Sequence, residues 1–62
     1  MYQRYVMLRD KKGVTDYQVA KETGITKSTF TDWKNGRSTP KFEKITKIAK
    51  YFGVSIDYFL NG

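Results

Sequence analysis

The chain has 62 residues, of which 39% are apolar, and its 12 Lys and Arg outweigh six Asp and Glu to give a net charge of +6. Cys and His are both absent. This composition excludes disulfides, thiolate metal sites, the usual zinc ligand sets, and Ser-His-Asp or Cys-His catalysis. No apolar run approaches the roughly 18 residues that span a bilayer. We therefore expect one cytoplasmic domain over residues 1–62, with no catalytic residue, metal or cofactor.

The basic residues concentrate in the middle of the chain. Residues 25–50 hold seven Lys or Arg against two Asp or Glu, whereas residues 51–62 hold one Asp and no cation. A basic region suits a polyanion, which means nucleic acid or an anionic membrane surface. A lysine-rich surface also serves solubility alone, so charge by itself leaves both interpretations open.

Glycines divide a helical pattern into short segments. Three of them are followed by an apolar residue and a hydroxyl, as Gly13-Val14-Thr15, Gly24-Ile25-Thr26 and Gly53-Val54-Ser55. Glycine closes a helix because it adopts a left-handed backbone without a Cβ clash, and the hydroxyl caps the next helix by accepting from a free amide. In the longer break after Gly36, Thr39 is the expected cap and Pro40 the first helical residue. The pattern predicts five helices, at residues 2–12, 16–23, 27–35, 40–52 and 56–60, and an all-α fold.

Apolar residues recur at helical spacing within the predicted segments. Such stripes mark the sides that helices bury against one another, and no segment alternates as a half-buried strand does. We expect one small core with no interior volume for a cofactor. Its expected members are Tyr5, Leu8, Val19, Ala20, Phe30, Trp33, Phe42, Ile45, Ile48, Ala49, Phe52, Ile56, Phe59 and Leu60, with Val14, Ile25 and Val54 at the corners.

The second and third predicted helices are joined by a three-residue turn that contains Gly24, and this is helix-turn-helix geometry. Ala20 is small where the two helices must cross closely. On these residues, and on the stretches 8–15, 28–36 and 52–60, the chain resembles the Cro/C1-type (Xre-like, lambda-repressor-like) helix-turn-helix family over essentially its whole length. The resemblance implies a compact five-helix bundle. It also implies binding to a pseudo-palindromic operator in double-stranded DNA as a homodimer, and usually transcriptional repression.

The resemblance places the third helix in the major groove, with its N-terminal residues at the base edges. When Phe30 is set at the centre of the buried face, the 100° helical step turns Ser28, Thr31 and Asp32 outward and leaves Lys27 at the flank. Lys27 can donate to guanine, and the two hydroxyls can donate, accept or meet a thymine methyl. The predicted base-contacting residues are Lys27, Ser28, Thr31 and Asp32. The predicted phosphate-contacting residues are Thr15, Asp16, Thr26, Lys34, Asn35, Arg37 and Lys41.

Structural alternatives exist for several of these residues. Ser28 and Thr31 also suit any exposed helix face, whereas a cation at the start of a helix, such as Lys27, has no local structural purpose. Asp32 either accepts from cytosine N4 or pairs with Arg37 across the following turn, and the two roles are weighted equally. The threonine caps serve structure first, although helix N-termini also bind phosphate.

The chain departs from the family pattern at two positions. Asp16 stands where the family often has a Gln that bridges phosphate and base, so we expect that contact to be lost or altered. The family often pairs an Arg in the first helix with a Glu at the end of the third. Here Lys34 occupies the Glu position, so Arg9 needs another partner or solvent.

We expect a sequence-specific transcriptional regulator, most simply a repressor of phage, prophage or bacterial type. The alternative is a protein-binding module, antirepressor-like or antitoxin-like, that retains the helix-turn-helix shape. A small dimer interface is available at Tyr51, Val54 and Tyr58, although ordinary partial burial explains these residues equally well. An enzyme is not expected because the six carboxylates show no catalytic grouping, and membrane binding is not expected because the apolar faces are committed to the core.

Overall fold

The computed structural model describes residues 1–61, and within them it contains five α-helices and no strand. The helices are α1 (Tyr2–Lys12), α2 (Asp16–Thr23), α3 (Lys27–Lys34), α4 (Phe42–Phe52) and α5 (Asp57–Leu60). The predicted all-α class is confirmed, while Gly62, the last residue of the predicted domain, lies outside the described residues. None of the described helices is long and apolar enough to cross a membrane.

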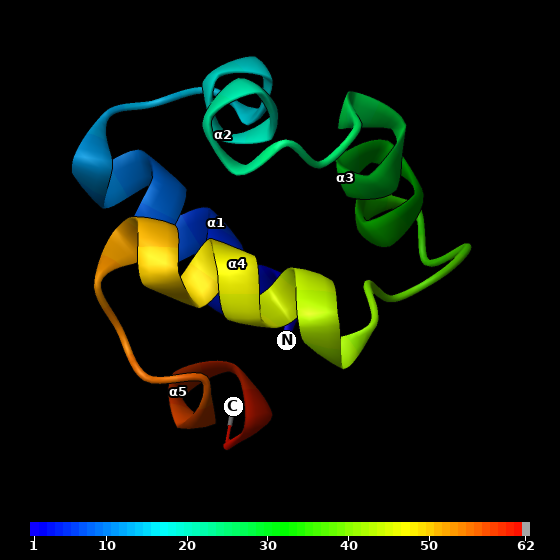
Figure 1. The fold of residues 1–62 in the computed structure, drawn as a ribbon. Coiled ribbons are helices and arrows are strands. Elements are labelled where there is room, and N and C mark those ends of the chain that lie inside the picture. Colours follow the sequence, from blue (N-terminus) through cyan, green and yellow to red (C-terminus); the bar gives the residue numbers. More distant parts are fainter. Residues whose placement is uncertain (62) are drawn as a thin grey trace.

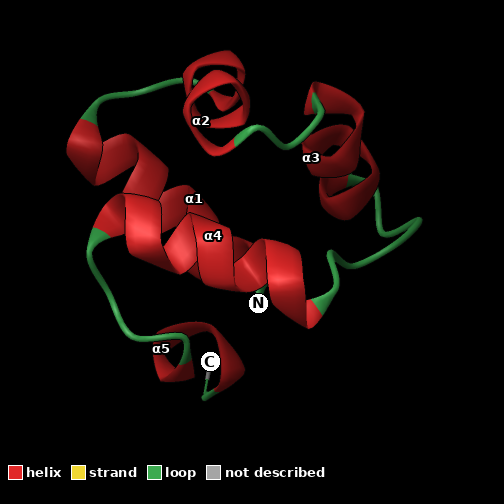
Figure 2. Ribbon diagram, in the orientation of Figure 1, coloured by secondary structure: helices red, strands yellow, loops and turns green. Residues whose placement is uncertain are grey.

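Helix α4 runs across the bundle in front of α1, with α2 and α3 on one side of it and α5 on the other (Figure 1). The second helix packs on α3 and α4, and α1 packs on α5. Short loops join successive helices, and the connection from α3 to α4 is the longest (Figure 2). Consequently α2 and α3 stand together at one side of the bundle, with their outer faces available to a partner.

The predicted hydroxyl cap is confirmed at the first of the three Gly-apolar-hydroxyl breaks. The Thr15 Oγ1 accepts from the Gln18 amide at 3.1 Å. The Ser55 Oγ accepts from the Asp57 amide at 3.2 Å, but the N-cap residue of α5 is Ile56 rather than Ser55. Thr26 is the N-cap residue of α3, but its hydroxyl accepts from no amide there. The Thr26 Oγ1 lies instead 3.1 Å from the hydroxyl oxygens of both Ser28 and Thr29. The side-chain capping role predicted for Thr26 is therefore wrong, because neighbouring hydroxyls compete for its oxygen.

The predicted start of the fourth helix is also wrong. Helix α4 begins at Phe42 rather than at Pro40, and its N-cap is the extended residue Lys41 rather than the predicted Thr39. Pro40 is buried and non-helical, so its ring packs as part of the loop and keeps this stretch extended. The preference of proline for a first helical turn is a local one, and tertiary packing overrides it here. Smaller differences occur at the ends of α3 and α5, which are each one residue shorter than predicted.

The core is built on aromatic side chains from several helices. Tyr5, Phe30 and Phe59 are at most 1% exposed. The Tyr5 ring stacks on Trp33 at a centroid distance of 5.3 Å and lies 5.1 Å from Phe30. Branched and small residues complete the buried set, which comprises Tyr5, Val19, Ala20, Ile25, Phe30, Trp33, Ile45, Ile48, Ala49 and Phe59.

Two residues predicted for the core lie outside it. Phe42 is 67% exposed and Leu60 is 54% exposed. Phe42 is the first residue of α4. Leu60 follows Phe59 directly, and since adjacent helical residues are about 100° apart, burying Phe59 turns Leu60 toward solvent.

Candidate nucleic-acid interface

The turn between α2 and α3 has the geometry that the sequence predicts. Gly24 follows α2 with a φ of 78°, in the left-handed region, and its N–H donates to the Ala20 carbonyl at 2.9 Å. The next residue, Ile25, is 5% exposed and anchors the turn in the core. On α3 itself, Phe30 and Trp33 are buried. Because these anchors hold the inner face of α3, the opposite face of the helix is fixed in direction.

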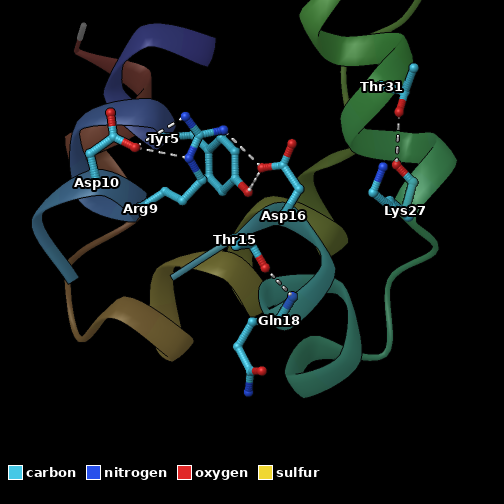
Figure 3. A network of polar contacts seen from close by, with 8 residues as sticks. All are labelled: Tyr5, Arg9, Asp10, Thr15, Asp16, Gln18, Lys27 and Thr31. Atoms are coloured by element: carbon cyan, nitrogen blue, oxygen red, sulfur yellow. Dashed lines mark hydrogen bonds and ion pairs between the residues drawn. The ribbon is translucent and has the colours of Figure 1, made fainter. Parts of the chain in front are cut away.

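The outer face of α3 carries the side chains predicted to meet bases. Lys27, Ser28 and Thr31 are exposed, and Asp32 is half-buried. The hydroxyl of Thr31 donates to the Lys27 carbonyl over a long 3.4 Å, as Figure 3 shows. That weak bond is easily exchanged, so the hydroxyl remains available to an external partner. The structure thus brings the four predicted base-contacting residues together on one helix.

The loop after α3 contains the ion pair that the sequence offered as an alternative for Asp32. The Arg37 Nη1 lies 3.6 Å from the Asp32 Oδ1, and the Arg37 amide donates to the Asp32 carbonyl at 2.8 Å. The Arg37 side chain is 72% exposed. An exposed pair at this distance is weak, so Arg37 can leave it for a phosphate. Near this loop, Lys34, Asn35 and Lys41 are also exposed.

A polar network ties the start of α2 to α1 (Figure 3). The buried Tyr5 hydroxyl donates to the Asp16 Oδ1 at 2.5 Å, and the Arg9 Nη1 donates to the same oxygen at 3.0 Å. Arg9 also pairs with Asp10 at 3.1 Å. Arg9 therefore finds its partners on α1 and α2. The four-residue spacing of Tyr5 and Arg9 puts them on one face of α1, but their contact with Asp16 depends on how the helices pack.

Electrostatics in this network favour an ionised Asp16. Burial alone would raise the pKa of Asp16, but the hydrogen bonds from Tyr5 and Arg9 and the nearby charges of Arg9 and Lys27 outweigh it and hold the pKa below its usual value. Burial and the hydrogen bond to Asp16 together raise the pKa of Tyr5. The hydrogen bond to Asp16 likewise raises the pKa of Arg9. At neutral pH the network consists of a neutral phenol, a carboxylate and a guanidinium.

The described residues offer no group of three His, Cys, Asp or Glu that could hold a metal ion. Within the same part of the chain, every buried side-chain nitrogen or oxygen has a hydrogen-bond partner. The chemistry available on the α2–α3 side is therefore that of hydrogen-bonding side chains and cations. Such an assortment suits recognition of an anionic polymer.

Comparison with known proteins agrees with this geometry. A family model described as helix-turn-helix matches residues 7–59. The chain is 33% identical to the HTH-type transcriptional activator BcrR of Enterococcus faecalis over 89% of its own length and 27% of that protein. It is 35% identical to the cryptic phage CTXphi transcriptional repressor RstR of Vibrio cholerae over 79% of its own length and 44% of that protein.

A third relative is an SPbeta prophage-derived uncharacterized HTH-type transcriptional regulator, YonR, of Bacillus subtilis (strain 168). The identity is 30% over 97% of this chain and 56% of that protein. The chain thus spans between about a quarter and just over half of the length of these relatives. No solved structure matches the chain.

Proposed function

The chain belongs to the helix-turn-helix family, and on this basis we propose that it is a sequence-specific transcriptional regulator that inserts α3 into the major groove of double-stranded DNA. The observation that carries the proposal is the division of α3 into two faces. Phe30 and Trp33 fasten one face into the core, while a lysine and small polar side chains cover the other. A helix held in this way can present donors and acceptors to base edges without rearranging.

Four residues of α3 supply the base contacts in this proposal. Lys27, at the start of α3, donates to guanine O6 and N7, and the Ser28 and Thr31 hydroxyls complement either strand. Asp32 accepts from cytosine N4 if Arg37 leaves it for the DNA backbone. Because a carboxylate in the groove also repels phosphate, Asp32 would sharpen sequence preference while lowering general affinity.

The phosphate contacts come from the last residue of α3 and from the turns before α2, before α3 and after α3. We assign Thr15, Thr26, Lys34, Asn35, Arg37 and Lys41 to this role, and each of them is exposed. Asp16 is assigned differently, because its carboxylate is held by Tyr5 and Arg9 and repels phosphate. Its part is to fix the junction of α1 and α2 beside the groove.

The regulator is proposed to repress, and to bind a pseudo-palindromic operator as a homodimer. Support comes from the relatives, which include a phage repressor and a prophage-derived regulator. A single helix-turn-helix reads one half-site, so pairing of two copies on DNA raises affinity by making the second contact intramolecular. Such a regulator works in the bacterial cytoplasm, where its operator lies.

Selection of random double-stranded DNA tests the proposal. The wild-type chain and a Lys27→Ala variant are each selected at low salt and near physiological salt. We expect wild type to enrich a two-fold-symmetric site with half-sites about one helical turn apart, and Lys27→Ala to relax preference at one position of each half-site. Lys11→Ala is the matched control, because Lys11 is an exposed lysine on α1. Salt-sensitive binding without any enriched sequence would contradict the proposal and favour a protein-binding module.

A further inference from the structure

An open hollow of about 370 Å³ lies beside the start of α3. Tyr17 and Lys21 of α2 line it from one helix, and Thr26 and Lys27 line it from the start of the next. Ala20 and Ile25, both buried, also contribute to its surface. The hollow therefore follows the helix-turn-helix from α2 across the turn to α3.

Tyr17 is the member of the hollow that the fold does not explain. The chain has five tyrosines, and the other four are either buried in the core or packed against it. Tyr17 is 64% exposed, so its ring gives little to stability. An exposed aromatic ring in a basic hollow has the chemistry of a contact residue, with an apolar face and a hydroxyl that donates.

The charged residues that line the hollow are both lysines. Lys21 follows Tyr17 by four residues, and so the two share a face of α2. Lys27 lies on the other wall, and no acidic residue is among the lining. These groups match the chemistry of a deoxyribose-phosphate unit. The two ammonium groups suit its anionic phosphate, and the phenol ring suits its partly apolar sugar.

The position of the hollow selects DNA over an acidic peptide. Thr26 and Lys27 belong both to the hollow and to the proposed DNA-binding face, so the two surfaces are continuous. When the second helix of a helix-turn-helix lies in the major groove, the first helix crosses the DNA backbone. The DNA strand that continues beyond the half-site past the start of α3 therefore lies against α2.

We propose that this hollow, through Tyr17 and Lys21, binds the deoxyribose-phosphate backbone that flanks the operator half-site. The inference rests on the proposed function and extends the interface from α3 onto α2. The Tyr17 hydroxyl donates to a phosphate oxygen while its ring lies on the neighbouring sugar, and Lys21 neutralises the same phosphate. The contact carries no sequence information, and it fixes the register of α3 in the groove.

Binding to two duplexes tests the assignment. Both duplexes carry the selected operator, and one of them ends at the edge of each half-site while the other continues for several base pairs. We expect Tyr17→Ala to bind the longer duplex about fivefold to tenfold more weakly than wild type does. On the trimmed duplex, which lacks the flanking backbone, the variant and wild type should be equal. Tyr17→Phe should weaken binding to the longer duplex by less than Tyr17→Ala does, because it keeps the ring and loses only the hydroxyl.

Salt dependence separates the two side chains. Lys21→Ala should lower the slope of log K against log salt by about 0.9, whereas Tyr17→Ala should leave this slope unchanged because tyrosine is uncharged. Met7→Ala is the matched control, because Met7 is 63% exposed and lies on α1 outside the hollow. Thermal unfolding of each variant verifies that the fold is intact.

Two results would overturn the assignment and leave the proposed function standing. One is operator binding by Tyr17→Ala equal to that of wild type on the longer duplex. The other is an equal loss on the longer and trimmed duplexes, which would place the effect of Tyr17 on α3 itself. A wild-type chain without any sequence preference would instead refute the proposed function.

Discussion

Replacing Tyr5 by Phe isolates a single hydrogen bond at the centre of the domain. The ring contacts of Tyr5 with Trp33 at 5.3 Å, Phe30 at 5.1 Å and Phe52 at 6.1 Å are available to phenylalanine as well. What the variant loses is the donation from the Tyr5 hydroxyl to the Asp16 Oδ1 at 2.5 Å. Asp16 keeps its bond from Arg9 at 3.0 Å, so its carboxylate is not left without a partner.

A hydrogen bond to a charged acceptor contributes about 1.5–3 kcal/mol to stability. We take about 2 kcal/mol for Tyr5→Phe, because Asp16 is 25% exposed and gains some water in exchange. In a domain of about 60 residues, each kcal/mol lowers Tm by roughly 4–8 °C, so the expected decrease is about 8–16 °C. Such a loss is a substantial fraction of the stability of a small domain.

The effect depends on pH with a definite sign. The folded structure lowers the pKa of Asp16, so this group stabilises the fold above its unfolded pKa of about 3.9, and the stabilisation is lost as pH falls through the folded pKa. Protonated Asp16 still accepts from Tyr5 as a neutral partner, for which about 1 kcal/mol is typical. The difference between wild type and Tyr5→Phe should therefore shrink by about half in strong acid.

Urea unfolding followed by circular dichroism, at pH 7 and in steps down to about pH 2, measures the stability loss of Tyr5→Phe and its decrease in acid. Asp16→Asn serves as a companion variant, since it keeps an oxygen acceptor for Tyr5 and removes the titrating charge. Its stability relative to wild type should rise as the pH falls. A Tyr5→Phe loss below about 0.5 kcal/mol at pH 7, or one of the same size at both ends of the pH range, would refute the reasoning.

Three further substitutions test the fold and the site. Gly24→Ala should destabilise by about 1–2 kcal/mol in urea unfolding, because its φ of 78° is strained for alanine although an added Cβ meets nothing within 4 Å; no change would mean that the backbone relaxes. Phe30→Ala empties a fully buried site and should cost about 3–5 kcal/mol, so a native circular dichroism spectrum with an unshifted Tm would contradict the core assignment. Arg37→Ala should change stability by less than about 0.5 kcal/mol, since its ion pair is exposed. The same variant should lower the slope of log K against log salt for DNA binding by about 0.9. Fluorescence anisotropy at several salt concentrations measures this slope, and an unchanged slope would contradict the assigned phosphate contact.

Local chemistry accounts for the parts of the fold that the sequence predicted well. Gly13, Gly24 and Gly53 each close a helix in the left-handed conformation, as their position before an apolar residue and a hydroxyl indicates. These signals act within a few residues, so they need no knowledge of the packed structure. The same holds for the burial of Phe30 and Trp33, which follows from their spacing on α3.

The features that the sequence did not predict depend on packing between residues far apart in the chain. Pro40 satisfies a local rule for starting a helix, but burial of its ring delays α4 to Phe42. Arg9 could not be matched with Asp16 from spacing alone, because their ion pair depends on the angle between α1 and α2. Tyr17 and Lys21 attract no attention in the sequence, and only the hollow shared with Thr26 and Lys27 connects them with the site.

Tyr5 has a consequence for motion as well as for stability. Its side chain reaches α2 through Asp16, α3 through Phe30 and Trp33, and α4 through Phe52. Detaching α3 would strip this ring of its neighbours, so the amides of α3 should exchange their hydrogens only when the whole domain opens. In the proposed complex, α3 would thus meet DNA already ordered and lose little entropy on docking. Changes confined to its outer face can then redirect sequence preference while the scaffold stays as it is.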